Sequence, residues 1–338
     1  MTERQLKSLL ERKFGRATVA GGGNGTEIIV ECPFCGHRKL SVNARKLVWQ
    51  CWHCGESGTA RKLLGRDVKV ERPERPERRQ VRLGYIPPGD TVPVGDLPEE
   101  HEAVVYLSGR KFDHRLISDA FGVSYCRAGR KFGGGVFDTS GTIVLPISEN
   151  GSDIAWQARL LYDPSKVPPE QAWAYGWKRE EDGSFVRPPK YFTSPGFRKG
   201  EHFFNLDNAR RFRFTVVTEG AFDAMRVGMC AVAAFGKGLT DDQVSILRDG
   251  WPLVVLLLDP DAASDQEALK ARLEGRGPFG GAASSGTKVV SVHLEGWKDA
   301  GDAPQGEVVR QILDACASSG VDLASYARED PFRVRRIQ

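Results

Sequence analysis

The sequence predicts a multidomain protein of mixed α+β and α/β class, with a small metal-binding module near its N-terminus. Two Cys-x-x-Cys pairs lie within residues 32–54, and a stretch rich in arginine and proline follows them. Beyond Phe214, short apolar runs alternate with helical patterns, which is typical of a central parallel sheet covered by helices on both faces. The division that we expect is a cysteine-rich module at 1–64, a basic Pro-rich linker at 65–96, a mixed α+β subdomain at 97–213, an α/β subdomain at 214–318 and a C-terminal tail at 319–338.

The composition is that of an ordinary globular protein. Of the 338 residues, 40% are hydrophobic and 27% are charged, which excludes disordered and low-complexity classes. No apolar run approaches the roughly 18 residues of a membrane helix and no signal peptide follows Met1, so we expect a cytoplasmic protein without a membrane partner. The net charge is only +4, but residues 60–82 hold nine Lys or Arg against four Asp or Glu. That excess either follows a phosphate backbone or belongs to a solvated linker.

The two cysteine pairs predict a structural zinc site of the zinc-ribbon kind. The four residues are Cys32, Cys35, Cys51 and Cys54. Fifteen residues separate the pairs, and the alternating stretches 40–43 and 47–50 predict a hairpin that brings the pairs together. His37 and His53 are spare candidates, and the alternative is four reduced, buried cysteines. A helix ended by Gly15 is expected before this module, since leucines recur at helical spacing over residues 3–14.

Aromatic and basic side chains accompany the second cysteine pair. Bases of single-stranded nucleic acid stack on rings while cations follow the phosphates, so we expect these side chains to contact single-stranded nucleic acid. The candidates are Trp52, His53, Arg38, Lys39 and Lys46. Trp49 belongs either to this surface or to the core of the module.

The remaining elements follow from hydrophobic periodicity. In the mixed region we expect helices at Ala103–Leu107 and His114–Phe121 and strands at Thr142–Pro146 and Ile154–Leu161. In the α/β region we expect strands at Phe214–Thr218, Cys230–Phe235, Leu253–Leu258 and Lys288–Leu294. The helices between and after them are expected at Ala221–Val227, Asp241–Leu247, Asp265–Leu273 and Glu307–Ala317.

Acidic residues follow three of the expected parallel strands. Glu219 comes after the first, Asp259 and Asp261 after the third, and Asp299 and Asp302 after the fourth. The carboxyl ends of parallel strands meet at one edge of a sheet, so these carboxylates are expected to converge there. Oxygen-ligated Mg²⁺ is their natural partner. Helix N-caps would explain Asp259 or Asp302 singly but not the whole set.

These motifs resemble a known family. Glu219-Gly-Ala-Phe-Asp223 with Asp259-Pro-Asp261 is similar to the Toprim signature, and Toprim after a four-cysteine ribbon resembles the DnaG-type primases of bacteria and bacteriophages. Further motifs agree in order over residues 28–303. They are Tyr106-Leu-Ser-Gly-Arg110, Thr142–Pro146, Gln157-Ala-Arg159 and Pro189-Lys-Tyr-Phe-Thr-Ser194.

The resemblance implies a DNA primase, a DNA-directed RNA polymerase that joins nucleoside triphosphates into short RNA primers on single-stranded DNA. It makes Glu219, Asp259 and Asp261 ligands of Mg²⁺ or Mn²⁺. It also implies that Asp223, Asp299 and Asp302 are accessory acids. It implies that Arg159 and Lys190 face nucleotide and template. Two departures stand out: Ser264 replaces the usual glycine, and the spacing from Asp299 to Asp302 is one residue longer than the commonest form.

The chain lacks a Walker A motif, so we expect the replicative helicase of the primosome to be a separate chain. Too few residues follow Gly320 for the family's usual helicase-binding domain. This favours a phage or mobile-element protein acting in a bacterial host cell.

Two alternatives remain open. A RecR-like recombination mediator also joins a four-cysteine finger to a Toprim unit, but it lacks the segment that holds Arg159 and Lys190. A Toprim nuclease or topoisomerase is the other, although a topoisomerase needs a tyrosine nucleophile in a large separate domain. Primer synthesis on single-stranded DNA distinguishes all of them.

Overall fold

The computed structural model describes residues 3–22, 25–44, 47–64, 85–236, 238–260, 263–275, 286–327, 330–332 and 334. The chain divides into two units, Met1–Val81 and Arg82–Gln338, which are described separately. Most of the expected linker, from residue 65 to residue 84, lies outside the described residues. Among the described helices, none is both long and apolar enough to cross a membrane.

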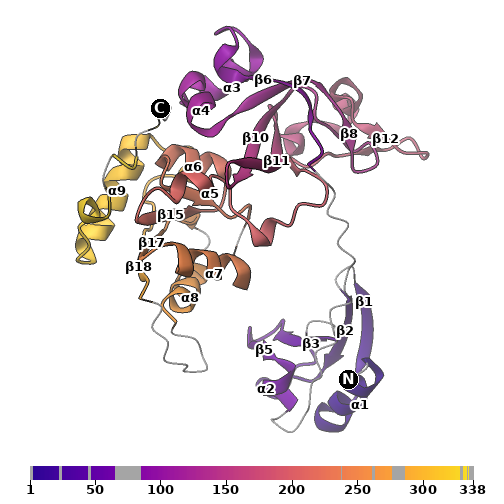
Figure 1. The fold of residues 1–338 in the computed structure, drawn as a ribbon. Coiled ribbons are helices and arrows are strands. Elements are labelled where there is room, and N and C mark those ends of the chain that lie inside the picture. The colour runs from indigo at the N-terminus through magenta and orange to yellow at the C-terminus, as the bar shows by residue number, and fades with distance from the viewer. Residues whose placement is uncertain are drawn as a thin grey trace. The chain divides into compact units, whose positions relative to one another are not determined.

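The first unit is an antiparallel five-stranded sheet with two helices (Figure 1). Its elements are α1 (Glu3–Phe14), β1 (Thr18–Gly22), β2 (Gly25–Val30), β3 (Leu40–Asn43), β4 (Val48–Cys51), β5 (Ser57–Thr59) and α2 (Ala60–Leu64). Strands β3 and β4 form the expected hairpin, with Leu40 opposite Cys51 and Asn43 opposite Val48. Leu6 and Leu10 of α1 are fully buried against the sheet, together with Ile28. The helical leucine spacing therefore supplies one side of this small core.

The second unit begins with an antiparallel sheet of order β14-β11-β10-β7-β6. Its strands are β6 (Gly89–Pro93), β7 (Ser124–Gly129), β10 (Thr142–Glu149), β11 (Ser152–Leu160) and β14 (Tyr191–Thr193). Helices α3 (Glu102–Gly109), α4 (His114–Phe121) and α5 (Leu206–Ala209) accompany it, with short strands β8 (Lys131–Phe132), β9 (Phe137–Asp138), β12 (Lys178–Arg179) and β13 (Phe185–Val186). The 3-10 helices here are η1 (Val94–Asp96), η2 (Pro164–Lys166), η3 (Pro169–Tyr175) and η4 (Lys199–Glu201).

The range 65–96, assigned to the linker from its composition, ends in ordered structure. Strand β6 pairs with β7 at the edge of the antiparallel sheet, and η1 follows it. The Pro-rich and charged composition conceals this strand, because an edge strand with one exposed face needs few apolar residues.

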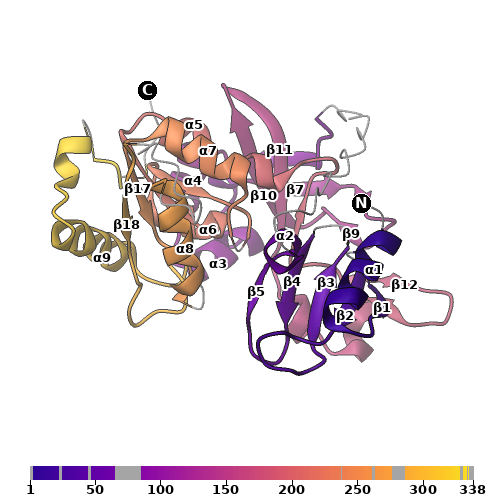
Figure 2. The same cartoon turned by 90° about the horizontal axis from the view of Figure 1, so that it is seen from below.

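A parallel sheet of order β16-β15-β17-β18 completes the second unit. Its elements are β15 (Phe214–Thr218), α6 (Ala221–Val227), β16 (Ala231–Ala233), α7 (Asp241–Gly250), β17 (Leu253–Leu256), α8 (Ala263–Leu273), β18 (Lys288–Ser291), α9 (Gln305–Ser318) and η6 (Leu323–Tyr326). Figures 1 and 2 both show α9 on one side of this sheet and α7 with α8 on the other. The predicted fold class is thus confirmed: a four-cysteine module, an antiparallel subdomain and a parallel four-stranded sheet as in a Toprim fold.

Alternating side chains build one core on each face of the parallel sheet. Val216 and Val255 belong to the core that contains α6 and α9, whereas Val217 and Leu256 belong to the core that contains α7 and α8. The first core continues into the antiparallel subdomain, where the rings of Phe121 and Phe204 stack at 6.2 Å. Because both faces are covered, only the ends of the strands are open to polar chemistry.

Candidate functional site

The carboxyl edge of the parallel sheet brings the first two predicted acids together. Strands β15 and β17 are neighbours in parallel register, with Val217 opposite Leu256. Glu219 follows β15 directly, and its Oε1 accepts a hydrogen bond of 3.2 Å from the backbone N–H of Asp259. Only 8% of Glu219 is exposed. The strand ends therefore place these two residues side by side, as the sequence pattern predicts.

Asp223 joins this edge from the first turn of α6. Its Oδ2 accepts the N–H of Gly220 at 3.1 Å, and its Oδ1 accepts the N–H of Gly301 at 2.7 Å. The pKa of Asp223 is raised to about 7, and burial is the largest cause. The charges of Asp299 and Asp259 raise this pKa more than the two N–H groups lower it. The shift reflects first the burial of this carboxyl group and then the nearby carboxylates Asp299 and Asp259.

The loop from Asp299 to Asp302 closes around the same point. A Cβ at Gly301 would lie 2.9 Å from Asp223 Oδ1, 3.1 Å from Arg110 Nη2 and 3.3 Å from Asp299 Oδ1, so only glycine fits without displacement. The Asp302 N–H donates to Asp299 Oδ1 at 2.9 Å, and Arg110 Nη2 lies 3.5 Å from Asp302 Oδ1. The predicted accessory acids thus meet at one rim.

The carboxylate rim, meaning Glu219, Asp223, Asp259, Asp299 and Asp302, is an all-oxygen donor set of the kind that Mg²⁺ prefers. Within the described residues, no three of these side chains bring oxygens within 4.8 Å of one another. The remaining predicted ligand, Asp261, lies outside the described residues. The described carboxylates of the rim therefore do not form a compact cluster of ligand atoms. The raised pKa of Asp223 is the observation that suits the rim to a cation.

Arg226 of α6 is a structural member of the site that sequence reasoning missed. Its guanidinium donates to the backbone carbonyls of Arg110, Lys111 and Gly301, the last at 3.1 Å. It also lies 4.0 Å from the centre of the Phe112 ring and is almost fully buried. One side chain thus ties the end of α3 to the acidic loop. An arginine in an apolar helix pattern was the only signal available.

The predicted basic residue Arg159 is buried between two tyrosine rings. Its guanidinium carbon lies 5.4 Å from the ring centre of Tyr106 and 5.0 Å from that of Tyr191. Burial is the main cause that raises the pKa of Tyr191, and the charge of Asp223 adds to it. Tyr191, one of the two rings against Arg159, therefore lies within electrostatic range of Asp223.

Lys190, the other predicted basic residue, forms an ion pair instead of facing open space. Its Nζ lies 3.3 Å from Asp163 Oδ2. Hydrogen bonds from Ser165 hold the pKa of Asp163 well below its usual range, and Lys190 lowers it further. Asp163 thus stays ionised and occupies Lys190 in this state of the molecule.

The four predicted zinc ligands of the first unit converge. Their sulfur atoms all lie within 4.8 Å of one another, with Cys32 Sγ 3.8 Å from Cys54 Sγ and Cys35 Sγ 3.7 Å from Cys51 Sγ. A tetrahedron with Zn–S bonds of about 2.3 Å has edges of about 3.8 Å, so the geometry matches a closed four-thiolate zinc site.

The surface beside this zinc site holds several predicted DNA contacts. Trp52 is 71% exposed, and the rings of His53 and His37 stack with centres 3.5 Å apart. Arg38 and Lys39 are exposed, whereas Lys46 lies outside the described residues. Trp49 is a core residue: it is 3% exposed, and its Nε1 donates to the carbonyl of Thr59 at 3.0 Å.

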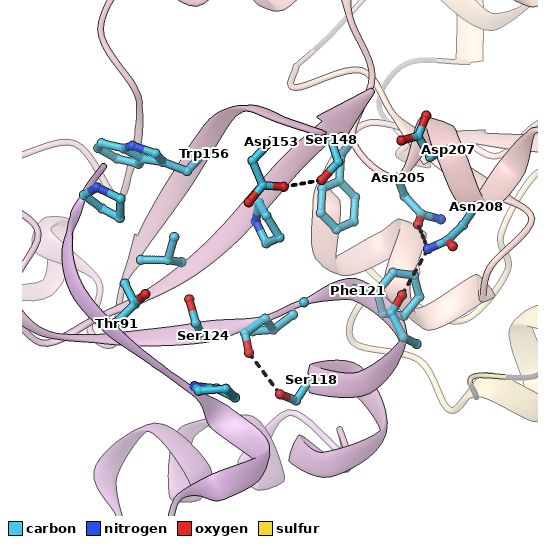
Figure 3. A pocket seen from close by; sticks show the side chains of 18 of the residues that line it. Thr91, Ser118, Phe121, Ser124, Ser148, Asp153, Trp156, Asn205, Asp207 and Asn208 are labelled. Atoms are coloured by element: carbon cyan, nitrogen blue, oxygen red, sulfur yellow. Dashed lines mark hydrogen bonds between the residues drawn. The ribbon is translucent and has the colours of Figure 1, made fainter. Parts of the chain in front are cut away.

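A cavity of about 460 Å³ opens elsewhere in the second unit, between the antiparallel sheet, α4 and α5 (Figure 3). The polar side chains that line it are largely engaged within the protein. Ser148 donates to Asp153, Asn208 donates to Asn205, and Asp207 accepts two backbone N–H groups from residues 150 and 151. The carboxylate rim is therefore the stronger candidate for chemistry.

Comparisons with known proteins agree with the predicted resemblance. A DNA primase of Helicobacter pylori strain J99 is 22% identical over 285 residues, which cover 74% of this chain and 50% of that protein. The DNA primase of strain 26695 is 23% identical over 288 residues, with the same coverage. The chain spans about half the length of these curated relatives. No family model matches it.

Among solved structures, the zinc-binding and RNA polymerase domains of the Aquifex aeolicus primase align with 93% of this chain and 83% of that one. The identity is 20% and the TM-score is 0.48. The sequence relatives and the four-cysteine cluster confirm the resemblance to DnaG-type primases that the motifs indicate.

Asp223 makes stability depend on pH. Its pKa is about 7 in the folded chain and 3.8 ordinarily, so its proton stabilises the fold fully below about pH 4, and this stabilisation is lost as the pH rises to about 7. Between about pH 5 and pH 8, without Mg²⁺, we expect wild type to lose about 2 kcal/mol of unfolding free energy relative to Asp223→Asn. Urea unfolding across this range measures the difference. Parallel pH profiles in the two proteins would contradict the assignment.

Arg226→Ala should destabilise the second unit by roughly 2–4 kcal/mol, because three buried or partly buried backbone carbonyls lose a charged donor. Arg226→Lys should recover only part of this, since one ammonium cannot reach all three. Thermal and urea unfolding give the values. The control is Arg310→Ala, which removes exposed ion pairs on α9 and should change stability by less than about 0.5 kcal/mol. Equal losses in the two alanine variants would refute the role given to Arg226.

Proposed function

We propose that this chain is a DNA primase that synthesises short RNA primers on single-stranded DNA by metal-dependent nucleotidyl transfer. The observation that carries the proposal is the carboxylate rim, where Glu219 accepts the N–H of Asp259 and Asp223 is hydrogen-bonded to the loop that runs from Asp299 to Asp302. Similarity to bacterial DNA primases over 74% of the chain supports it. The antiparallel subdomain with Arg159 favours a polymerase over a RecR-like mediator, which lacks such a segment.

The donor set fits Mg²⁺ or Mn²⁺. Glu219, Asp259 and Asp261 would hold the metal, and Asp223, Asp299 and Asp302 would support it. When bound as a pair, such ions activate the attacking 3′-hydroxyl and neutralise the departing pyrophosphate. Asp223 contributes differently, because its two hydrogen bonds fix the positions of Gly220 and Gly301 and so orient the neighbouring carboxylates.

Arg159 and Lys190 would provide positive charge for the phosphates. Packing between Tyr106 and Tyr191 fixes the guanidinium of Arg159 before substrate arrives, which is the preorganisation that electrostatic catalysis requires. To contact a phosphate oxygen, Lys190 must first break its ion pair with Asp163. Since Asp163 stays ionised, the ion pair would hold the Lys190 ammonium in place in the absence of nucleotide.

The zinc module would read the template through Trp52, His53, Arg38, Lys39 and Lys46, with bases stacked on the rings and phosphates near the cations. The finer expectations belong to the same proposal. They are nucleoside triphosphates as substrates, a replicative helicase as a separate chain, a bacterial cytoplasm as the site of action, and an origin in a phage or mobile element.

Asp259→Asn should lower primer synthesis by roughly 100- to 1000-fold, because a neutral amide holds the cation poorly. Binding of single-stranded DNA should persist. Extension products on an oligonucleotide template with radiolabelled nucleotides measure the first, and fluorescence anisotropy the second. Asp249→Asn, an exposed acid at the end of α7, is the matched control and should leave both unchanged. Near-normal primer yield from Asp259→Asn would defeat the proposal.

Cys35→Ser should release zinc and remove the preference for particular template sequences, because the ribbon loses one of four ligands. His37→Asn keeps all four thiolates and should retain one zinc per chain, which tests the alternative set of Cys35, His37 and His53. Atomic absorption gives the zinc content, and sequencing of primers made on random templates gives the preference. Because Cys35 belongs to both sets, zinc lost in His37→Asn as well as in Cys35→Ser would favour the histidine set.

A further inference from the structure

The segment that joins β11 to β14 presents aromatic rings to solvent from a folded support. Trp173 and Tyr175, both in η3, are 72% and 44% exposed. We propose that these two residues form a second contact surface for single-stranded DNA, the stacking platform, which receives template bases on the same unit as the carboxylate rim. This inference rests on the proposed function, since it assigns a substrate contact to the same catalytic unit.

The support beneath the rings is packed. Val167, Ala172 and Trp177 form a small buried cluster of their own, and Trp177 Nε1 donates to the hydroxyl of Tyr162 at 3.2 Å. The cap residue Gly176, at φ 66°, ends η3 in the left-handed conformation. One short helix therefore buries Ala172 completely while it holds Trp173 outward, so the exposure of the indole is built into the local fold.

The stacking platform connects to the catalytic residues through Tyr162. The rings of Tyr162 and Tyr175 lie 4.6 Å apart, and the carbonyl of Tyr162 accepts a 3.1 Å hydrogen bond from Arg159 Nη1. Arg159 in turn lies over the rings of Tyr106 and Tyr191. A chain of contacts thus runs from Tyr175 on η3 through Tyr162 and Arg159 to the rings of Tyr106 and Tyr191.

Charged side chains of both signs surround the stacking platform. Lys166 and Arg187 are exposed on either side of η3 in the sequence, and Lys190 lies beyond them. The nearby acids are Glu170 within η3, residues 180–182 in the turn between β12 and β13, and Asp163, which is paired with Lys190. The charges therefore balance, and the exposed rings carry the proposal. Exposed rings with cations alongside are what single-stranded DNA requires, because every base offers a face for stacking.

The test is binding of a fluorescein-labelled oligodeoxythymidylate of about 20 nucleotides to the full, zinc-loaded chain, followed by anisotropy. Trp173→Ala should raise Kd by about 5- to 100-fold, the range expected when one stacked base is lost. Trp173→Phe keeps a ring and should retain most of the affinity. Leu116→Ala, a 45% exposed apolar residue on α4, is the matched control and should bind as wild type does.

A Kd for Trp173→Ala within twofold of wild type would overturn the stacking platform, as would equal losses in Trp173→Ala and Leu116→Ala. Unchanged unfolding profiles confirm that each variant is folded. Primer synthesis by wild type separates the two proposals. Active wild type with DNA affinity independent of Trp173 refutes the platform alone, and inactive wild type with Trp173-dependent binding refutes the primase proposal alone.

Discussion

Negative charge gathered at the carboxyl edge of the parallel sheet is the constraint on which the second unit depends. Strands β15 and β17 deliver Glu219 and Asp259 to that edge because their registers match, and α6 adds Asp223 from its first turn. Burial and the charges of Asp299 and Asp259 raise the pKa of Asp223 to about 7, although two backbone N–H groups lower it. Closing a loop over such a site requires a glycine at position 301, because a side chain there would not fit. It also requires the long side chain of Arg226, which donates to the carbonyl of Gly301.

The first unit is stabilised on a different principle. Its sheet is small and its core contains few residues, so a metal bound by four thiolates would supply stability that packing alone does not. The hairpin of β3 and β4 sets Leu40 opposite Cys51, which fixes the distance between the two cysteine pairs. With the zinc site closed by the cysteines, the rings of Trp52 and His53 are left to contact other molecules.

Patterns of local sequence predicted the sites that depend on spacing along the chain. The cysteine pairs and the acids after β15 and β17 were visible because a knuckle or a strand end fixes each residue relative to its neighbours. Arg226, the pairing of Lys190 with Asp163 and the exposure of Trp173 were not predicted. Each depends on partners brought near by tertiary packing, such as the carbonyl of Gly301, 75 residues from Arg226. Strand β6 was not predicted for a related reason. It is a strand because it pairs with β7, and its own composition does not indicate one.

The central claim is that the carboxylate rim binds divalent cations. Anomalous diffraction from crystals of the zinc-loaded chain soaked in Mn²⁺, recorded at the manganese edge, tests it most directly. The account predicts a manganese peak in contact with carboxylate oxygens of Glu219 and Asp259. A fully soaked crystal with no peak at the rim, or with manganese bound only elsewhere, would contradict it.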